Sequence, residues 1–535
     1  MPDQVYRRFP WKVGALGAVM LLALCIAGCS APEAWPERGP PNILVIVADD
    51  QRWDQLGLVQ REQGSAARFP FLRTPHLDAL AEQGMRFRNA FVTTSLCSPS
   101  RSSILTGQYV HRHLVIDNQT DFPGGPTFAT ALGEAGYTTA YFGKWHHGSQ
   151  RARPGFDYVA SFMAQGTYYD APFVVTNPWF DMLGFGPRWT QTEGHVDERT
   201  LDYLLDYLDA PRAQPFAVVV GLKGAHQPFT AMEQHRGRFA SNEIQAPANW
   251  SHFPPWVPRR TLSPEPPSGN RTITAMLETV LSVDESVGRI LRAMDERDLA
   301  DNTLVVFTSD NGYYLGEHLL GDKRSAYEPS MRVPLLLRYP GVIPRGAISD
   351  ALVLNIDIAP TLVDVALGSV PATMQGRSLK SLYEPPGATW REDFLYEFWQ
   401  LPYAEARLPG DEASSWGVLA SLTTPTIVAV RTRSHKLITY RDKPEYTELY
   451  DLVADPAETN NLAGSAGHAE LQAQMCARLQ RLLDETEYDF EAPVRDWWAR
   501  SRFADKENSI YAPLAARPVS VTSPTVNCQA AVPRS

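Results

Sequence analysis

Four groups of polar residues follow apolar segments of this 535-residue chain, and their side chains can bind cations, anions or protons. The groups are Asp49-Asp50, Lys144-Trp145-His146-His147, Lys223-Gly224-Ala225-His226 and Asp310-Asn311. Adjacent carboxylates are costly to bury unless a cation or several hydrogen-bond donors offset their charge. Carboxylate and amide oxygens suit a hard cation, while lysine binds anions and histidine exchanges protons. These residue types predict a cation beside a site for an anion and for proton transfer.

A fifth stretch, Cys97-Ser98-Pro99-Ser100-Arg101, is typical of the start of a helix. Pro99 is tolerated in a first turn because the N–H that proline lacks would have no partner there. Cys97 would lie at the positive end of the helix dipole, with Arg101 one turn further on. Such a position stabilises a thiolate or an oxyanion, although a small buried cysteine without a chemical role fits the same pattern.

Alternating strands and helices are expected to position these residues. Continuous apolar runs, which suit buried parallel strands, cover residues 42–48, 139–143, 216–222 and 303–309. Amphipathic helices are predicted at Thr74–Phe87, Thr127–Ala135, Asp197–Leu208 and Thr272–Arg297. This alternation indicates an α/β fold with a largely parallel sheet, and sites in such sheets lie outside the carboxyl ends of the strands. We therefore expect the polar groups to meet at one edge.

The Cys97–Arg101 stretch, followed by Leu105-Thr106-Gly107, resembles the signature of type I, formylglycine-dependent sulfatases of the alkaline-phosphatase superfamily. Further matching segments are Gly143-Lys144-Trp145-His146, Lys223-Gly224-Ala225-His226, Ser309-Asp310-Asn311-Gly312 and Leu449-Tyr450-Asp451-Leu452. The resemblance spans roughly residues 41–462, and its motif style is closest to glucosamine-6-sulfatases and other glycan sulfatases. It implies a large mixed, mainly parallel sheet between helices, plus a smaller C-terminal α+β domain with an antiparallel sheet.

The resemblance also implies a mechanism. A maturation enzyme would oxidise Cys97 to formylglycine, whose hydrated aldehyde attacks the sulfur of a sulfate ester on a sugar or polysaccharide. The metal ligands would be Asp49, Asp50, matured Cys97, Asp310 and Asn311, around one divalent cation, Ca²⁺ in preference to Mg²⁺. The catalytic residues would be Arg101 on the diol, Lys144 and Lys323 on the sulfate, His226 as acid for the leaving alcohol, and His146 as acceptor of the second diol proton.

Three other basic residues are weaker candidates for substrate contacts. These are His318, Lys223 and His147, each of which also has a structural interpretation. Glu328 is expected to have a structural role near the site. Aromatic-rich segments at 160–195 and 245–270 read as ordered loops that either stack on sugar rings or pack over the sheet edge.

The N-terminal residues predict export. Arg7, Arg8 and Lys12 precede an apolar run at 13–26 that is short for a membrane span. The small residues before Cys29 resemble a bacterial lipobox, which implies cleavage before Cys29 and lipidation of its sulfur; the alternative is a plain secretory signal. We expect a bacterial lipoprotein that faces the periplasm or the cell surface and is held to the membrane by acyl chains only.

The expected domain organisation has five parts. They are a signal peptide at 1–28, a Pro-rich tether at 29–40, the catalytic domain at 41–386, a smaller domain at 387–507 and a poorly ordered tail at 508–535. Cys476 and Cys528 could pair in an oxidising compartment. The formal net charge of -11 argues against nucleic acid as a partner.

Two alternative functions stay open at this point. The first is a phosphomonoester or phosphodiester hydrolase of the same superfamily, which a single cation site with Asp and Asn ligands disfavours because two-metal phosphatases use more ligands. The second is a catalytically dead, lipid-anchored glycan-binding protein, which the presence of every implied catalytic position disfavours.

Overall fold

The computed structural model describes residues 39–148, 150, 152–176, 188–257, 270–384, 389–400 and 423–500. From Pro40 onward the chain forms one compact unit. The predicted signal peptide, the lipidation of Cys29, nearly all of the tether, the tail and Cys528 lie outside the described residues. Within the described part, no helix is both long and apolar enough to cross a bilayer.

Ten strands form one mixed sheet, in the order β12-β2-β11-β8-β1-β7-β3-β4-β5-β6. Their bounds are β1 (Asn42–Ala48), β2 (Met85–Phe91), β3 (Thr138–Lys144), β4 (Tyr158–Phe162), β5 (Phe173–Val175), β6 (Arg188–Thr190), β7 (Phe216–Gly221), β8 (Thr303–Ser309), β11 (Leu335–Arg338) and β12 (Ala347–Leu354). The central strands β8, β1, β7, β3 and β4 are parallel, whereas β11, β5 and β6 run antiparallel to their neighbours. The predicted mixed, mainly parallel sheet is confirmed.

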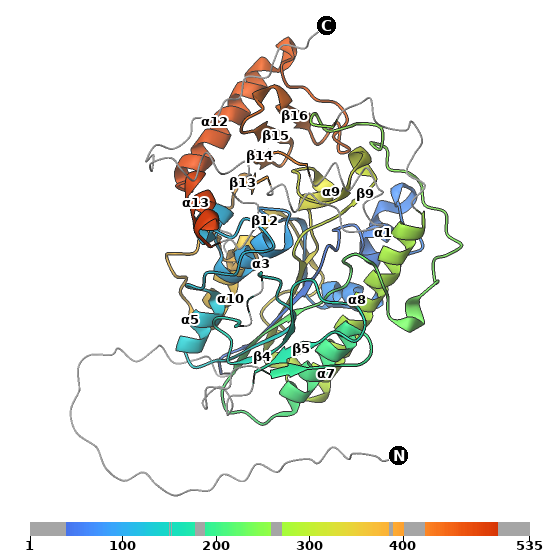
Figure 1. Ribbon diagram of the computed structural model, residues 1–535, viewed down its shortest axis with the longest axis vertical. Coiled ribbons are helices and arrows are strands. Elements are labelled where there is room, and N and C mark those ends of the chain that lie inside the picture. The colour runs from blue at the N-terminus through green and yellow to red at the C-terminus, as the bar shows by residue number, and fades with distance from the viewer. Residues whose placement is uncertain are drawn as a thin grey trace, which may run out of the picture. The chain divides into compact units, whose positions relative to one another are not determined.

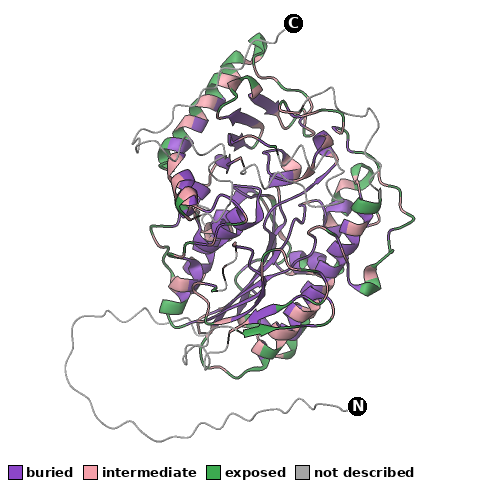
Figure 2. Ribbon diagram, viewed as in Figure 1, coloured by how far each residue is buried: buried purple, intermediate pink, exposed green. Residues whose placement is uncertain are grey.

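Helices cover both faces of this sheet, because alternate residues of β1 point into two different cores. Ile43, Val45 and Val47 pack with α3 (Cys97–Thr106), α5 (Phe128–Glu134) and α10 (Ile358–Leu367). Leu44, Ile46 and Ala48 pack with α2 (Pro75–Gln83), α7 (Val196–Asp209) and α8 (Asn270–Glu296). Figure 1 shows the two helical layers on opposite sides of the sheet. Figure 2 shows buried strands between helices whose outer faces are exposed.

A second, antiparallel sheet has the order β13-β14-β15-β16. Its strands are β13 (Asp393–Phe398), β14 (Ile427–Thr432), β15 (His435–Tyr440) and β16 (Glu448–Asp451), with α12 (Ala469–Glu485) packed against the first three and α13 (Glu491–Arg500) following. Its apolar side chains belong to the same core cluster as one face of the large sheet. The predicted small antiparallel sheet is therefore present, while the boundary at 386/387 falls outside the described residues.

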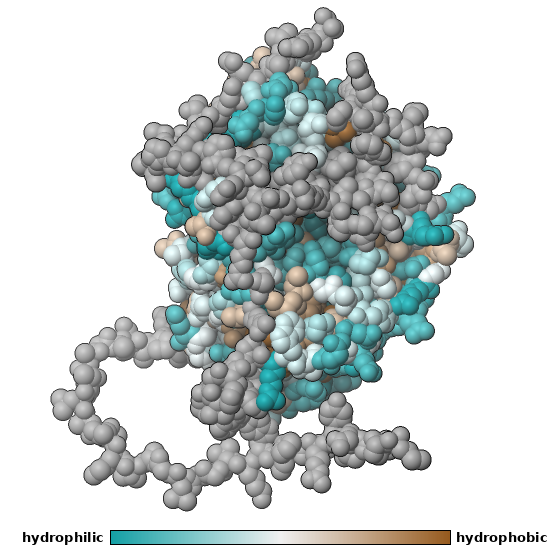
Figure 3. All heavy atoms as spheres, in the orientation of Figure 1, coloured by the Kyte–Doolittle hydropathy of each residue, from teal (hydrophilic) through white to brown (hydrophobic). Residues whose placement is uncertain are grey.

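Short elements complete the fold. They are α1 (Gly57–Gln63), α4 (Val110–His113), α9 (Glu328–Met331) and the hairpin of β9 (Tyr314–Leu315) and β10 (Gly321–Asp322). On the face drawn in Figure 3, the described surface is mostly hydrophilic or neutral, with small separate apolar areas. The large apolar side chains that are exposed, among them Trp189 and Val453, belong to different elements of the chain.

The helix predicted at Thr74–Phe87 is wrong at its C-terminal end. The helix ends at Gln83, and residues from Met85 form strand β2. Gly84 lies against the backbone of β11, where an added Cβ would be 2.0 Å from the Leu337 oxygen. The chain therefore leaves the helix at Gly84 and enters the sheet. The segment 160–195 is also not only a loop, because β5 and β6 extend the sheet there; Trp179 and Phe180 lie outside the described residues.

Candidate active site

The four predicted polar groups meet at one edge of the large sheet. Strands β8, β1, β7 and β3 are parallel neighbours, so their carboxyl ends lie next to one another. Asp49 follows β1, Lys144 ends β3, His226 lies beyond β7 and Asp310 follows β8. The first helix after β2, α3, begins at Cys97 as the sequence predicts and points that end toward the same group.

Three buried carboxylates form the centre of the site. Asp49, Asp50 and Asp310 each offer an oxygen, and these oxygens lie within 4.8 Å of one another. The backbone N–H of Asp50 donates to Asp310 Oδ1 at 3.1 Å, and Asn311 Nδ2 donates to Asp50 Oδ1 at 2.6 Å. Asp50 has a φ of +63°, a left-handed conformation that turns its side chain back toward β8.

The carboxylate group fits a hard cation. Two buried oxygens, Asp50 Oδ2 and Asn311 Oδ1, have no hydrogen-bond partner among the described residues. Burial raises the pKa of Asp50 to about 7, with Lys323 opposing the shift and Asp49 and Asp310 adding to it. Burial likewise raises the pKa of Asp310. Oxygen donors in this number and charge suit Ca²⁺ or Mg²⁺.

Each carboxylate is also paired with a different basic side chain. Lys144 Nζ donates to Asp49, Lys323 Nζ donates to Asp50, and Arg101 Nε donates to Asp310 Oδ2 at 2.8 Å. Burial tends to raise the pKa of Asp49, but Lys144, His226, Arg101 and Lys323 together outweigh it, so that pKa lies well below its ordinary value. Arg101 Nη2 is buried without a partner among the described residues. Three cations thus converge on the place where an anion would bind.

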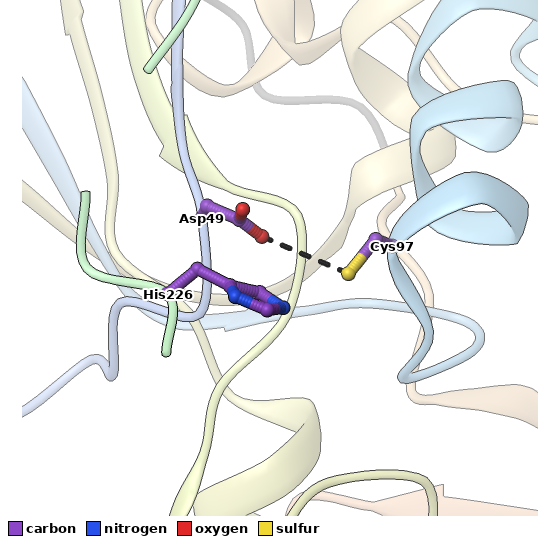
Figure 4. A group of neighbouring side chains, drawn as sticks. All are labelled: Asp49, Cys97 and His226. Atoms are coloured by element: carbon purple, nitrogen blue, oxygen red, sulfur yellow. Dashed lines mark hydrogen bonds between the residues drawn. The ribbon is translucent and has the colours of Figure 1, made fainter. Parts of the chain in front are cut away.

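Cys97 lies beside Asp49, with Sγ 3.7 Å from Oδ1 (Figure 4). The side chain is fully buried, and burial raises its pKa to about 12 despite Lys144 and Lys323 nearby. The thiol is therefore neutral at ordinary pH and a poor nucleophile. Sulfur is also a poor match for the oxygen donors around it. An oxygen in its place would suit both the carboxylate group and the unpaired Arg101 nitrogen.

Two histidines flank this group. His226 Nε2 lies 3.8 Å from Asp50 Oδ2, and its Nδ1 is 2.6 Å from the Gln227 oxygen. The His226 side chain is 15% exposed, whereas Lys144 is fully buried. His146 has a φ of +58°, and its Nδ1 is buried without a partner among the described residues. Burial lowers the pKa of both histidines, and the nearby Asp49 carboxylate opposes the shift.

The weaker candidates occupy different surroundings. His147 packs between Trp145 and Phe122 and bonds Ser102 Oγ at 2.8 Å, which favours a structural role. His318 stacks on Tyr327 at 4.0 Å and bonds the His252 oxygen at 2.9 Å. The contacts of His318 among the described residues do not include the carboxylate group. Its proposed part in substrate binding therefore stays a prediction.

Glu328 joins α9 to the small sheet. Its carboxylate contacts Lys436 at 2.9 Å and Arg431 at 3.3 Å, and its N–H donates to Glu458 at 2.9 Å. Burial is outweighed by the two basic groups, so the pKa of Glu328 is well below its ordinary value. These contacts belong to packing between the two sheets and match the structural role expected for this residue.

Sequence reasoning missed Gln165. Its side-chain oxygen accepts from Lys144 Nζ at 2.6 Å, and its backbone oxygen accepts from Lys223 Nζ at 2.8 Å. Tyr168, three residues on, donates to the His226 oxygen at 2.6 Å and lies under Lys223 Nζ at 4.8 Å. Burial lowers the pKa of Lys223 to about 8, with Lys144 adding to the shift. The aromatic content of the segment hinted at a loop near the site, but no signal singled out the glutamine.

A buried charge network supports the loop that follows Asn311. Arg52 donates to Glu317 Oε1 at 2.7 Å, to Asp54 Oδ1 at 2.8 Å and to the Tyr313 oxygen at 2.9 Å. Arg68 adds a second bond to Glu317 at 2.5 Å. This network ties the segment after Asp50 to the segment before Lys323. Arg52 and Glu317 are 265 positions apart, so spacing could not have linked them.

The chain matches two protein families. Residues 41–369 match the family described as Sulfatase. Residues 419–485 match the family described as N-sulphoglucosamine sulphohydrolase, C-terminal. The first match covers the large sheet and all the polar groups described above.

Among curated proteins, the chain is 29% identical to an N-acetylglucosamine-6-O-sulfatase of Bacteroides thetaiotaomicron, over 88% of this chain and 90% of that one. It is 30% identical to an N-acetylglucosamine-6-sulfatase of Bos taurus, over 75% and 78%. A similar solved structure, with a TM-score of 0.69 and 27% identity, covers 84% of this chain and 98% of that one; it holds its substrate, D-glucosamine-2-N,6-O-disulfate.

Proposed function

The chain belongs to the sulfatase family, and from that premise we propose that it removes 6-O-sulfate from glucosamine units of a sulfated saccharide. It is a sulfuric ester hydrolase, and the sugar is inferred from its relatives. The observation that carries the mechanism is the convergence of Lys144, Lys323 and Arg101 on three buried carboxylates next to Cys97.

Asp49, Asp50, Asp310 and Asn311 would hold one divalent cation, with Ca²⁺ preferred over Mg²⁺. The unpartnered oxygens of Asp50 and Asn311 support this assignment, because a buried acceptor without a donor is costly. Ca²⁺ accepts irregular oxygen geometries more readily than Mg²⁺ does. Such an ion supplies positive charge against the developing charge of the reaction.

Formylglycine made from Cys97 by a maturation enzyme would supply a gem-diol nucleophile that later releases sulfate by losing the proton of its second hydroxyl. The neutral thiol of Cys97 and its mismatch with the oxygen donors support this maturation. Arg101, whose Nη2 is unpartnered, would hold an oxygen at that position with a charge-assisted hydrogen bond.

The remaining residues bind the anion and move protons. Lys144 and Lys323 each have one strong carboxylate partner and would turn their other N–H groups toward the sulfate oxygens. His226, with its side chain partly exposed, would donate a proton to the leaving alcohol. His146, buried and with Nδ1 free of a hydrogen bond within the described structure, would accept the proton that the residue at position 97 loses.

Export as a lipoprotein is part of the proposal. The basic N-terminus, the apolar run at 13–26 and the small residues before Cys29 support a lipid anchor in a bacterial membrane. A polysaccharide substrate outside the cytoplasm would be consistent with this location.

Sulfate release from N-acetylglucosamine-6-sulfate tests the proposal, with the matching 6-phosphate and a galactose-6-sulfate as controls. We expect turnover of the first substrate to be at least about tenfold faster than that of either control. Faster turnover of the phosphate would support the phosphatase alternative instead. Mass spectrometry of the peptide that contains Cys97, from protein matured in a bacterial host, checks the nucleophile; an active enzyme with an intact thiol there would overturn it.

A further inference from the structure

Two adjoining cavities lie between α12, the segment 389–393 that leads into β13, and the segments 375–377 and 432–435, away from the residues of the active site. Their volumes are about 660 Å³ and about 470 Å³. They share Trp390, Arg391, Glu392 and Arg478 as lining residues and so form one continuous depression. We call it the arginine groove.

The arginine groove concentrates positive charge in an acidic protein. Its five arginines are Arg377, Arg391, Arg433, Arg478 and Arg481, against the lining acidic residues Glu392, Asp393 and Glu485 and against the buried Asp357, which pairs with Arg391. The whole chain carries a formal net charge of -11. A local field of the opposite sign raises the concentration of anions at the groove.

Two of the guanidinium groups are held in place by one buried carboxylate. Asp393, with only 6% of its side chain exposed, accepts from Arg478 Nη1 at 2.7 Å and from Arg481 Nη2 at 2.7 Å. The side chains of these two arginines remain 42% and 44% exposed. One buried carboxylate thus fixes two guanidinium groups that line the groove, and Glu485 holds the other terminal nitrogen of Arg481 at 2.7 Å.

Two further arginines have no ion-pair partner among the described residues. These are Arg377, beside the first cavity, and Arg433, in the turn between β14 and β15. Trp390 lies between the cavities, and its indole N–H donates to the Leu352 oxygen at 2.7 Å, which fixes the ring. The groove thus presents arginine side chains that can bind anionic groups and an aromatic ring that can stack on an apolar face. This combination suits a polymer ligand that carries both anionic groups and apolar ring faces.

The arginine groove is separate from the active site. Cys97 begins α3, whereas Gln375 donates to the Gly107 oxygen just past the other end of that helix. Ten residues of helix span about 15 Å. A second segment of a long saccharide, or a second chain, would therefore occupy the groove while one sugar reacts.

We propose that the arginine groove binds an internal segment of a sulfated polysaccharide and so retains the enzyme on polymeric substrate. The choice of a sulfated saccharide rests on the proposed function; the choice of a polyanion rests on the groove alone. The groove has no part in the chemistry, so it should affect polymers and leave single sugars unaffected.

The test uses the mature enzyme and the variant R377Q/R433Q, which removes two charges and breaks no ion pair between residues that the structure describes. The matched control is R292Q/R345Q, which removes two exposed arginines that also have no ion-pair partner within the described structure. Binding to immobilised heparin is measured in a Cys97→Ala background, so that turnover does not interfere. Turnover is measured with Cys97 intact, on N-acetylglucosamine-6-sulfate and on heparin.

We expect R377Q/R433Q to weaken binding to heparin about tenfold, since two exposed charge contacts are lost, and the control to weaken it less than about twofold. Turnover of the monosaccharide should match that of the unmodified enzyme in both. Equal heparin affinity of the two double variants would overturn the proposal, as would groove-dependent binding to anionic phospholipid vesicles without binding to heparin. If heparin binding depends on the groove but the enzyme releases no sulfate, the proposed function is wrong and the proposal that the groove binds a polyanion is supported.

Discussion

Two buried clusters of polar side chains in this molecule differ in how many of their oxygen atoms have a hydrogen-bond partner. At the edge of the large sheet, Asp50 Oδ2 and Asn311 Oδ1 are buried without a partner among the described residues. In the small domain, Glu448 accepts hydrogen bonds from Tyr327 at 2.7 Å and from Tyr440 and Tyr450 at 2.5 Å. A complete cluster, whose polar atoms all have partners within the chain, stabilises the fold. An incomplete cluster, with unpartnered oxygens, is suited to bind a ligand.

The largest expected effect comes from the incomplete cluster. Asp50→Asn removes a charge from the proposed cation site and should reduce kcat/KM by about 10⁴-fold, since such an ion contributes several kcal/mol to the barrier. The free energy of unfolding in EDTA should not fall, because burial and the repulsion from Asp49 and Asp310 disfavour a charge at position 50 by more than its pair with Lys323 favours it. Kinetics and urea denaturation measure the two quantities. If the Asp50→Asn enzyme keeps most of its activity, the cluster around Asp50 does not bind a cation that catalysis requires.

Asp284 is an intermediate case, with hydrogen-bond donors but no cation. It accepts from the N–H groups of His76 and Leu77 at 3.0 and 2.8 Å, and burial raises its pKa to about 7. Asp78 and Glu285 add to the shift. Because the folded protein holds the proton more tightly than the unfolded chain does, the contribution of Asp284 to stability is present below pH 4 and is lost as the pH rises through about 7.

The Asp284→Asn variant should therefore lack a fall of about 4 kcal/mol in the free energy of unfolding between pH 4 and pH 8. Urea titrations of both proteins at several pH values measure the difference. A variant that follows the pH profile of the unmodified protein would show that the hydrogen bonds to His76 and Leu77 already satisfy the charge.

The complete cluster should respond in stability alone. Glu448→Ala leaves three buried tyrosine hydroxyls without their acceptor and should lower the free energy of unfolding by about 3 kcal/mol. Tyr440→Phe, which removes one of the three bonds, should cost about 1 kcal/mol. At temperatures where the variants stay folded, kcat and KM should be unchanged. A large drop in kcat for Tyr440→Phe would place this cluster in the catalytic apparatus.

The smallest expected effect concerns Gln165, which completes the hydrogen bonding of Lys144. Gln165→Ala should reduce kcat about tenfold with little change in stability, because Lys144 loses one of its two acceptors and its orientation. Gln191→Ala is the matched control; Gln191 lies in the same 160–195 segment, and within the described residues its side chain bonds only the backbone oxygens of Asp170 and Thr192. Equal kinetics of the two variants would remove Gln165 from the list of positioning residues.

Sequence patterns predicted the parts of the fold that depend on local composition. The apolar runs Asn42–Ala48 and Thr303–Ser309 are strands with those bounds, and the helix predicted at Asp197–Leu208 is α7 (Val196–Asp209). Such elements follow from the periodicity and length of their apolar residues. The helix predicted beyond Gln83 failed because contact between Gly84 and β11 decides where that helix ends.

The polar groups of the site could be predicted because strand ends of a parallel sheet converge. Gln165 and the Arg52–Glu317 pair could not, since each depends on where a long loop returns to the site. The arginine groove was missed for a similar reason. Its arginines come from four segments between residues 377 and 481, and only the pair Arg478 and Arg481, three residues apart on α12, could be placed together from local spacing.

Two contacts to β13 limit how early the segment around Cys97 can fold. The backbone N–H of Ser95 donates to Tyr396 Oη at 3.2 Å, and the buried His111 pairs with Glu397 at 2.8 Å. Both ends of the segment that carries Cys97 are thus anchored to β13. This segment therefore cannot make these contacts until residue 397 has been synthesised, so its final packing depends on a part of the chain about 300 residues further on.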